Sequence, residues 1–180
     1  MKIKFWGVRG SIGSPIRPEG VKQKVHKLLS LVRPTDIQNE QSITKFLDSL
    51  SFSASSTYGG NTTCVEIRDK ENNLIIIDGG TGLRELGNSL MASGFGKTGG
   101  HAHWILTHTH WDHIQGIPFF VPLFIPTNEF EFISSFEDLE ARFQHQFVFT
   151  HFPVSFDHYS AKKKFSHIPE GQEFSLGPHI

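Results

Sequence analysis

Three histidines and one aspartate fall within six positions, directly after residues 102–107, an apolar stretch typical of a strand. The four side chains are His108, His110, Asp112 and His113. In an extended chain, residues two apart project to the same side, so His108 and His110 can offer nitrogens to one cation at about 2.0–2.1 Å. Asp112 and His113 then turn toward a neighbouring position. This density of donors predicts a metal site where a strand ends.

Two alternatives need no metal: a histidine-rich surface loop, or a histidine cluster satisfied by hydrogen bonds. Four ligand-type residues between a strand and Gly116 favour metal binding over both. Imidazole and carboxylate donors without thiolate favour zinc, with manganese or iron as alternatives. Two such ions about 3.5–4 Å apart would lower the pKa of a bridging water toward about 7. The donor set therefore predicts metal-dependent hydrolysis.

The segments around this motif alternate between strand-like and helix-like patterns, which predicts an α/β layered fold. Strand patterns cover residues 3–8, 64–68, 73–78, 102–107, 164–168 and 173–180, and helix patterns cover residues 81–92 and 136–147. Residues 74–77 are apolar throughout, so both faces of that strand are expected to be covered.

Residues 21–32 and 37–50 repeat apolar side chains at helical spacing and predict a helical insertion near residues 19–50. Asp36 is the expected N-cap of the second helix. No repeat and no second-domain boundary is visible, so residues 1–180 are expected to form a single domain.

Composition narrows the classes of function. The 180 residues carry a net charge of -1 with lysines and arginines spread along the chain, which argues against an extended nucleic-acid-binding face. Cys64 has no cysteine partner and is expected in the core. No apolar run approaches the roughly 18 residues that a membrane span needs. We therefore expect a cytoplasmic protein without membrane contact.

The pattern His108-x-His110-x-Asp112-His113 resembles the signature of metallo-β-lactamase-fold hydrolases. The resemblance implies an αββα sandwich with two divalent metal ions at one edge. It implies that His108 and His110 bind the first ion, and that Asp112 and His113 bind the second or act as its catalytic base. Asp78 matches an aspartate that orients a ligand histidine, although an Asp before two glycines fits a simple turn equally.

Three further motifs, at residues 5–11, 58–62 and 116–120, are similar to the branch that includes ribonuclease Z-like proteins and cyclic-nucleotide phosphodiesterases. This similarity implies a small-molecule or nucleotide phosphodiester substrate, attacked by a metal-bound hydroxide. The same fold also serves hydrolases of lactones, thioesters and β-lactams. A non-catalytic metal-binding or partner-binding half-fold is the alternative from another class.

The resemblance further implies a third histidine, a metal-bridging aspartate and a final histidine after residue 180. His179 does not replace them, because it lacks the family's following context. The chain is thus expected to be the amino-terminal half of the sandwich, incomplete at its C-terminus. Its expected partner is a missing C-terminal half or, in a homo-oligomer, another copy. Weak metal affinity and little activity are expected for this chain alone.

The remaining histidines and aromatics have less specific patterns. His101 and His103 precede the carboxyl edge of the sheet and are expected to pack or to support ligands, with a role as extra metal ligands as the alternative. His151 and His158 are expected in surface loops, with the wall of a substrate pocket as the alternative. Trp111 is expected to pack in the core, with the mouth of an active site as its alternative.

Overall fold

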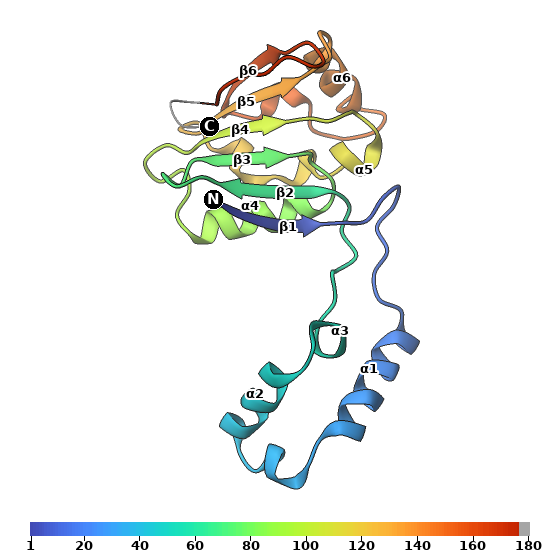
Figure 1. Cartoon of the computed structure of the whole chain (residues 1–180). Helices are drawn as coiled ribbons and strands as arrows, with labels where there is room; N and C mark the ends of the chain where they lie inside the picture. The colour runs from blue at the N-terminus through green and yellow to red at the C-terminus, as the bar shows by residue number, and fades with distance from the viewer. Residues whose placement is uncertain (177–180) are drawn as a thin grey trace. The chain divides into compact units, whose positions relative to one another are not determined.

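The structure is a computed structural model that describes residues 1–176. Its centre is a six-stranded sheet in which the strands follow one another in sequence order (Figure 1). The strands are β1 (Lys2–Gly7), β2 (Cys64–Arg68), β3 (Leu74–Ile77), β4 (His101–Ile105), β5 (Glu129–Ser134) and β6 (Lys162–His167). β1, β2 and β3 pair antiparallel, whereas β3 to β6 run parallel. The predicted α/β class is confirmed by this mixed sheet and its helices.

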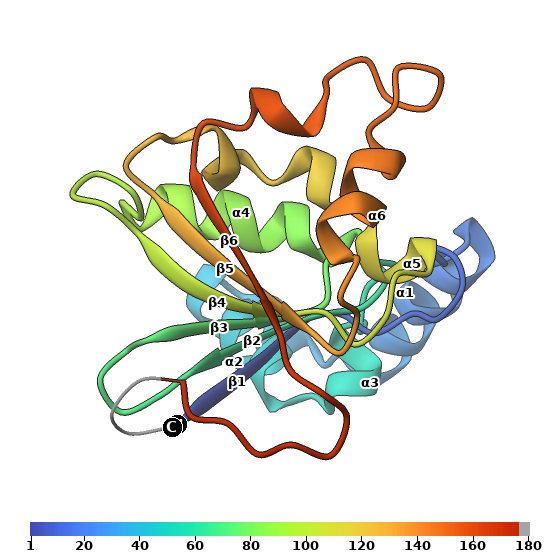
Figure 2. The same ribbon diagram turned by 90° about the horizontal axis from the view of Figure 1, so that it is seen from above.

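The main core lies on the face of the sheet covered by helices α4 (Gly82–Ala92) and α6 (Leu139–Gln146) (Figure 2). The short helices α5 (Trp111–Ile114), η2 (Ile117–Phe119), η3 (Val121–Phe124) and η4 (Phe156–His158) complete the elements after β4. Trp104 is fully buried there, and its ring lies 5.0 Å from that of Phe132. Cys64 is also fully buried, as predicted, and burial raises the pKa of its thiol.

The opposite face of the sheet carries a smaller apolar cluster built on Ile75 and Ile133, against which Leu176 packs. Leu74 and Ile76 point the other way, into the main core. The prediction that the apolar strand is covered on both faces is therefore confirmed. Toward β1 this second face is open, since Phe5 is 65% exposed.

Residues 14–60 form a compact unit of their own, separate from the unit of residues 1–13 and 61–180. It contains the predicted helical insertion, as α1 (Pro18–Leu31), η1 (Pro34–Ile37), α2 (Glu40–Ser49) and α3 (Phe52–Ser55). The expected cap of the second helix is wrong. Asn39 caps α2 by accepting a hydrogen bond from the Ser42 N–H at 2.9 Å, whereas Asp36 accepts from the Arg33 N–H within η1.

Two strand predictions also need correction. β5 was not predicted, although its Glu129-Phe130-Glu131-Phe132 alternation has the period of a half-buried strand. The strand expected at residues 173–180 is absent over 173–176, and residues 177–180, with His179, lie outside the described residues. Among the described residues, no helix is both long enough and apolar enough to cross a membrane.

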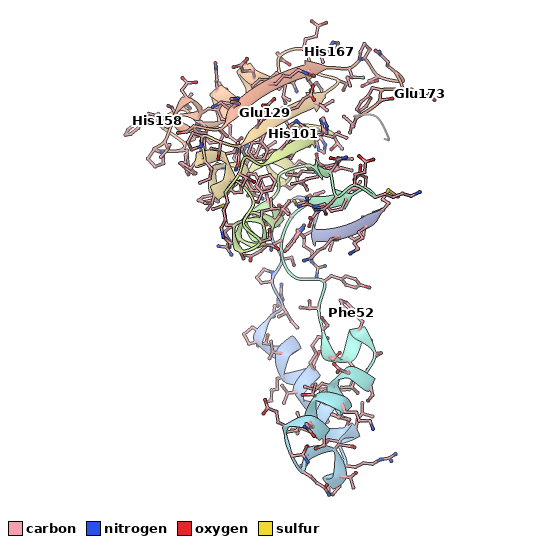
Figure 3. The ribbon with its side chains drawn as sticks, turned by 90° about the vertical axis from the view of Figure 1, so that its left-hand side faces the viewer. Phe52, His101, Glu129, His158, His167 and Glu173 are labelled. Carbon is pink, nitrogen blue, oxygen red and sulfur yellow. The ribbon has the colours of Figure 1, made fainter. Side chains whose placement is uncertain are left out.

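Glu131 links three strands on the face of the sheet opposite the main core. Its Oε2 lies 3.0 Å from Nδ1 of His103 on β4, and its Oε1 accepts hydrogen bonds from Lys164 Nζ and Ser166 Oγ on β6, each at 2.6 Å. Burial raises the pKa of Glu131, but these donors outweigh burial and lower it to about 2. His103 thus has a polar contact with Glu131. The labelled His158 and His167 lie near opposite ends of β6 (Figure 3).

Glu131→Gln is expected to lower the free energy of unfolding at pH 7 by about 1–2 kcal/mol, because it removes charge-assisted hydrogen bonds. The folded-state pKa lies below the unfolded one, so this stabilisation is full above the unfolded pKa and is lost as the pH falls through about 2. Urea unfolding from pH 7 to pH 2 should therefore show a smaller acid loss in the variant. Exposed Glu129→Gln is the control, and equal acid dependence in all three proteins would contradict the assignment.

Candidate metal centre

The predicted donors gather where β3 and β4 end. Because these two strands run parallel, their carboxyl ends meet at the same edge of the sheet. After β4, the chain stays extended at His110 and then turns into α5. Asp78 directly follows β3 and has a φ of 58°, a left-handed conformation that turns the chain sharply.

The structure brings all four predicted donors into one neighbourhood. The ring of His108 lies with its centroid 3.9 Å from that of His113 and 4.6 Å from that of His110. Nε2 of His113 lies 3.4 Å from Oδ2 of Asp112. Even so, across residues 1–176 no three His, Cys, Asp or Glu side chains are arranged to hold one metal ion. Dinuclear binding therefore stays a prediction.

Asp78 is the buried anchor of this neighbourhood, at 2% exposure. Its Oδ1 accepts hydrogen bonds from the backbone N–H of Thr107 at 2.9 Å and from the Thr107 hydroxyl at 2.8 Å. Its Oδ2 lies 2.8 Å from Nδ1 of His113. Because a carboxylate accepts the proton in this contact, a neutral His113 carries its proton on Nδ1 and has its lone pair on Nε2. Asp78 thus has contacts beyond those of a simple turn.

The Thr107 hydroxyl fixes the tautomer of His108 in the same way. A hydroxyl has a single proton, and that of Thr107 is donated to Asp78. Nδ1 of His108, 3.1 Å from the same Oγ1, must then be the donor of that contact. In their neutral form, both rings therefore present an unprotonated Nε2, the form in which imidazole binds a metal. In their chemistry, these donors fit zinc.

Asp112 is held by a residue from the other end of the chain. The backbone N–H of Ser11, 101 positions earlier, donates to Oδ2 of Asp112 at 2.7 Å. This hydrogen bond is the main reason that the pKa of Asp112 lies below its usual value; burial raises it, and His113 adds to the lowering. Ser11 has a φ of 65°, a conformation uncommon outside glycine. The carboxylate is thereby kept ionised and oriented.

Close backbone contact fixes α5 against the strand ends. Gly79 N–H donates to the His113 carbonyl at 2.6 Å, and Gly116 N–H donates to the Gly79 carbonyl at 2.8 Å. A Cβ on Gly80 would overlap the carbonyl oxygen of Asp112, and one on Gly116 would overlap that of Gly80. Only glycine leaves room for this approach.

Sequence reasoning missed three residues that shape the site. Thr107 and Ser11 hold His108 and Asp112, and Arg142 on α6 donates from Nη1 to the Thr109 hydroxyl at 3.2 Å. The signal for Thr107 was available, because it directly precedes the motif. The other two lie far along the chain and only the fold brings them near.

In comparisons with known proteins, no family model, no curated protein and no solved structure matches this chain, so the resemblance of its motif to metallo-β-lactamase-fold hydrolases stays a prediction.

Thr107→Val is expected to release the tautomer of His108 while leaving that of His113 unchanged, because only His108 depends on the hydroxyl. Nitrogen NMR of the imidazoles measures both rings. In the unmodified protein, both should carry the proton on Nδ1. Exposed Thr127→Val, outside the site, serves as control. If the His108 spectrum does not respond to loss of the hydroxyl, Thr107 does not set the tautomer of His108.

Proposed function

We propose that this chain carries part of the dinuclear metal site of a hydrolase with the metallo-β-lactamase fold, acting on phosphodiesters. The observation that carries the proposal is the buried Asp78, which contacts Nδ1 of His113 directly and Nδ1 of His108 through the Thr107 hydroxyl, so that Nε2 of both rings is free to bind an ion beside Asp112. In this proposal the sheet with α4 and α6 is one αβ layer pair of an αββα sandwich.

His108, His110, Asp112 and His113 are the residues that would hold the ions, with zinc favoured over manganese or iron. When bound, two divalent cations polarise a phosphoryl oxygen and lower the pKa of a water molecule. The remaining donors come from water, from substrate or from residues other than those described, since residues 1–176 contain no three-donor group. Metal affinity of this chain by itself is accordingly weak.

The side chains of the site keep its donors in place before any ion arrives. Asp78 fixes the ring of His113 directly and that of His108 through the Thr107 hydroxyl. The Ser11 N–H holds Oδ2 of Asp112 and lowers the pKa of that carboxyl. A lowered pKa weakens a base but suits an anionic ligand, so Asp112 is better fitted to binding an ion than to accepting a proton.

The preference for phosphodiesters rests on the three motifs similar to the ribonuclease Z-like and cyclic-nucleotide phosphodiesterase branch. Residues of two of these motifs make contacts in the candidate centre. Residues 5–11 supply the Ser11 N–H to Asp112, and residues 116–120 begin with Gly116, which packs on Gly79. Those motif residues therefore support the site itself.

Asp78→Asn is expected to weaken zinc binding by this chain about 10–100-fold, the usual effect of losing a group that orients a ligand histidine. The amide keeps the shape of the side chain but not its charge. Isothermal titration calorimetry with zinc, manganese and iron(II) measures the change. Asp157→Asn, on an exposed side chain of η4, should bind like the unmodified chain. Equal zinc affinity in both variants would show that Asp78 does not contribute to metal binding.

Turnover separates the candidate functions. The full-length protein, supplied with zinc, should hydrolyse bis(4-nitrophenyl) phosphate and not a thioester or a β-lactam. His113→Ala should reduce kcat/KM at least about 100-fold, because it removes a donor that touches the ion. The exposed His167→Ala should not. Hydrolysis of acyl substrates alone would overturn the phosphodiester assignment, and stoichiometric metal without turnover would indicate a binding module.

A further inference from the structure

A cavity of about 970 Å³ lies beside the candidate metal centre, and its function is not explained by metal binding. One wall comes from the motif itself, through Thr109 and Trp111. Another part of the wall comes from α6, through Arg142 and Gln146. Thr109 lies between His108 and His110 in the sequence. A ligand that contacts Thr109 in this cavity is therefore close to the metal donors.

The cavity is lined by three aromatic rings, two of which are largely exposed. Trp111 is 78% exposed and Phe119 is 54% exposed, and both line it. Phe152 lines it as well and packs edge-on against Phe119, with ring centroids 5.7 Å apart. Large aromatic surface left open to solvent around a concave site is typical of ligand binding. These rings favour a flat apolar group.

The polar side chains of the cavity are held in place, which gives it a defined shape. Arg142 Nε donates to Asp138 Oδ1 at 2.8 Å, and its guanidinium lies 4.0 Å from the ring centroid of Phe136. Asp138 also lines the cavity and offsets the charge of Arg142, so neither a free anion nor a free cation is strongly favoured. The charge balance agrees with the aromatic lining.

Gln146 adds a buried acceptor to the wall. Its Nε2 donates to the Ile114 carbonyl at 3.1 Å, which fixes the orientation of the amide. Its Oε1 is buried and has no hydrogen-bond partner among the described residues. Buried acceptors in native proteins are nearly always paired. The unpaired Oε1 therefore favours a ligand that carries an N–H or O–H group.

We infer that this cavity binds the flat aromatic group of the substrate, with Trp111 and Phe119 against the ring. The inference rests on the proposed function only for placing the phosphoryl group at the neighbouring donors. The class of substrate is then an ester that joins a phosphoryl group to an aromatic or heteroaromatic moiety.

Phenylphosphonate and methylphosphonate test this, because they share the charged group and differ in the ring, and neither has an ester bond to hydrolyse. Calorimetry on the full chain, with and without zinc, should show phenylphosphonate binding about tenfold tighter, as expected for one stacked ring. Trp111→Ala should abolish the difference. Phe149→Ala, at a ring that is 86% exposed and outside the cavity lining, should keep it.

The indole N–H signals identify the position of the ring. Trp111 should shift on adding phenylphosphonate, whereas Trp6, whose Nε1 donates to Glu66, should not. A ring preference that persists without zinc supports the cavity even if the metal centre fails. Equal binding of the two phosphonates, no binding of phenylphosphonate, or an unchanged ratio in Trp111→Ala would overturn the inference even if phosphodiesters are hydrolysed.

Discussion

The arrangement of the candidate centre depends on one buried carboxylate. A charge out of contact with water is costly unless hydrogen bonds surround it, and Asp78 has donors from Thr107 and His113 on both of its oxygens. Its backbone takes part as well, since its N–H donates to the Ile105 carbonyl and its carbonyl accepts from Trp104 Nε1. The ends of β3 and β4 and the start of α5 are thereby locked together around one side chain.

Close backbone packing also holds α5 against the strand ends. Glycines at 79, 80 and 116 let α5 lie directly on the strand ends, so the rings of His108 and His113 are set by main-chain position as well as by hydrogen bonds. Such preorganisation lowers the entropic cost of binding, because fewer rotamers are lost when a ligand arrives. The donors are ordered even though they do not yet surround a common point.

Short sequence patterns predicted those features of the fold and site that depend on neighbouring residues. The apolar run before Asp78 and the donor spacing after Ile105 located the strand ends and the four side chains. β5 was overlooked because Glu129 and Glu131 made an alternating strand look polar, and only the fold shows that Glu131 is partnered by Lys164. Ser11 and Arg142 were beyond reach for another reason: their contacts with residues 112 and 109 span 101 and 33 positions, which no short window contains.

The pairing of β1 with β2 has a consequence for the order in which the protein assembles. Residues 8–63 separate the two strands, so their pairing closes a long loop and carries the largest entropic cost among neighbouring strands of the sheet. Ser11 follows β1 and holds Asp112. One carboxylate of the centre is thus secured only when the most distant strand docks, while its imidazole neighbours depend on contacts formed within residues 78–113. The entropic cost of closing this loop grows only with the logarithm of its length. The helical insertion can therefore become longer or shorter without disturbing the histidines.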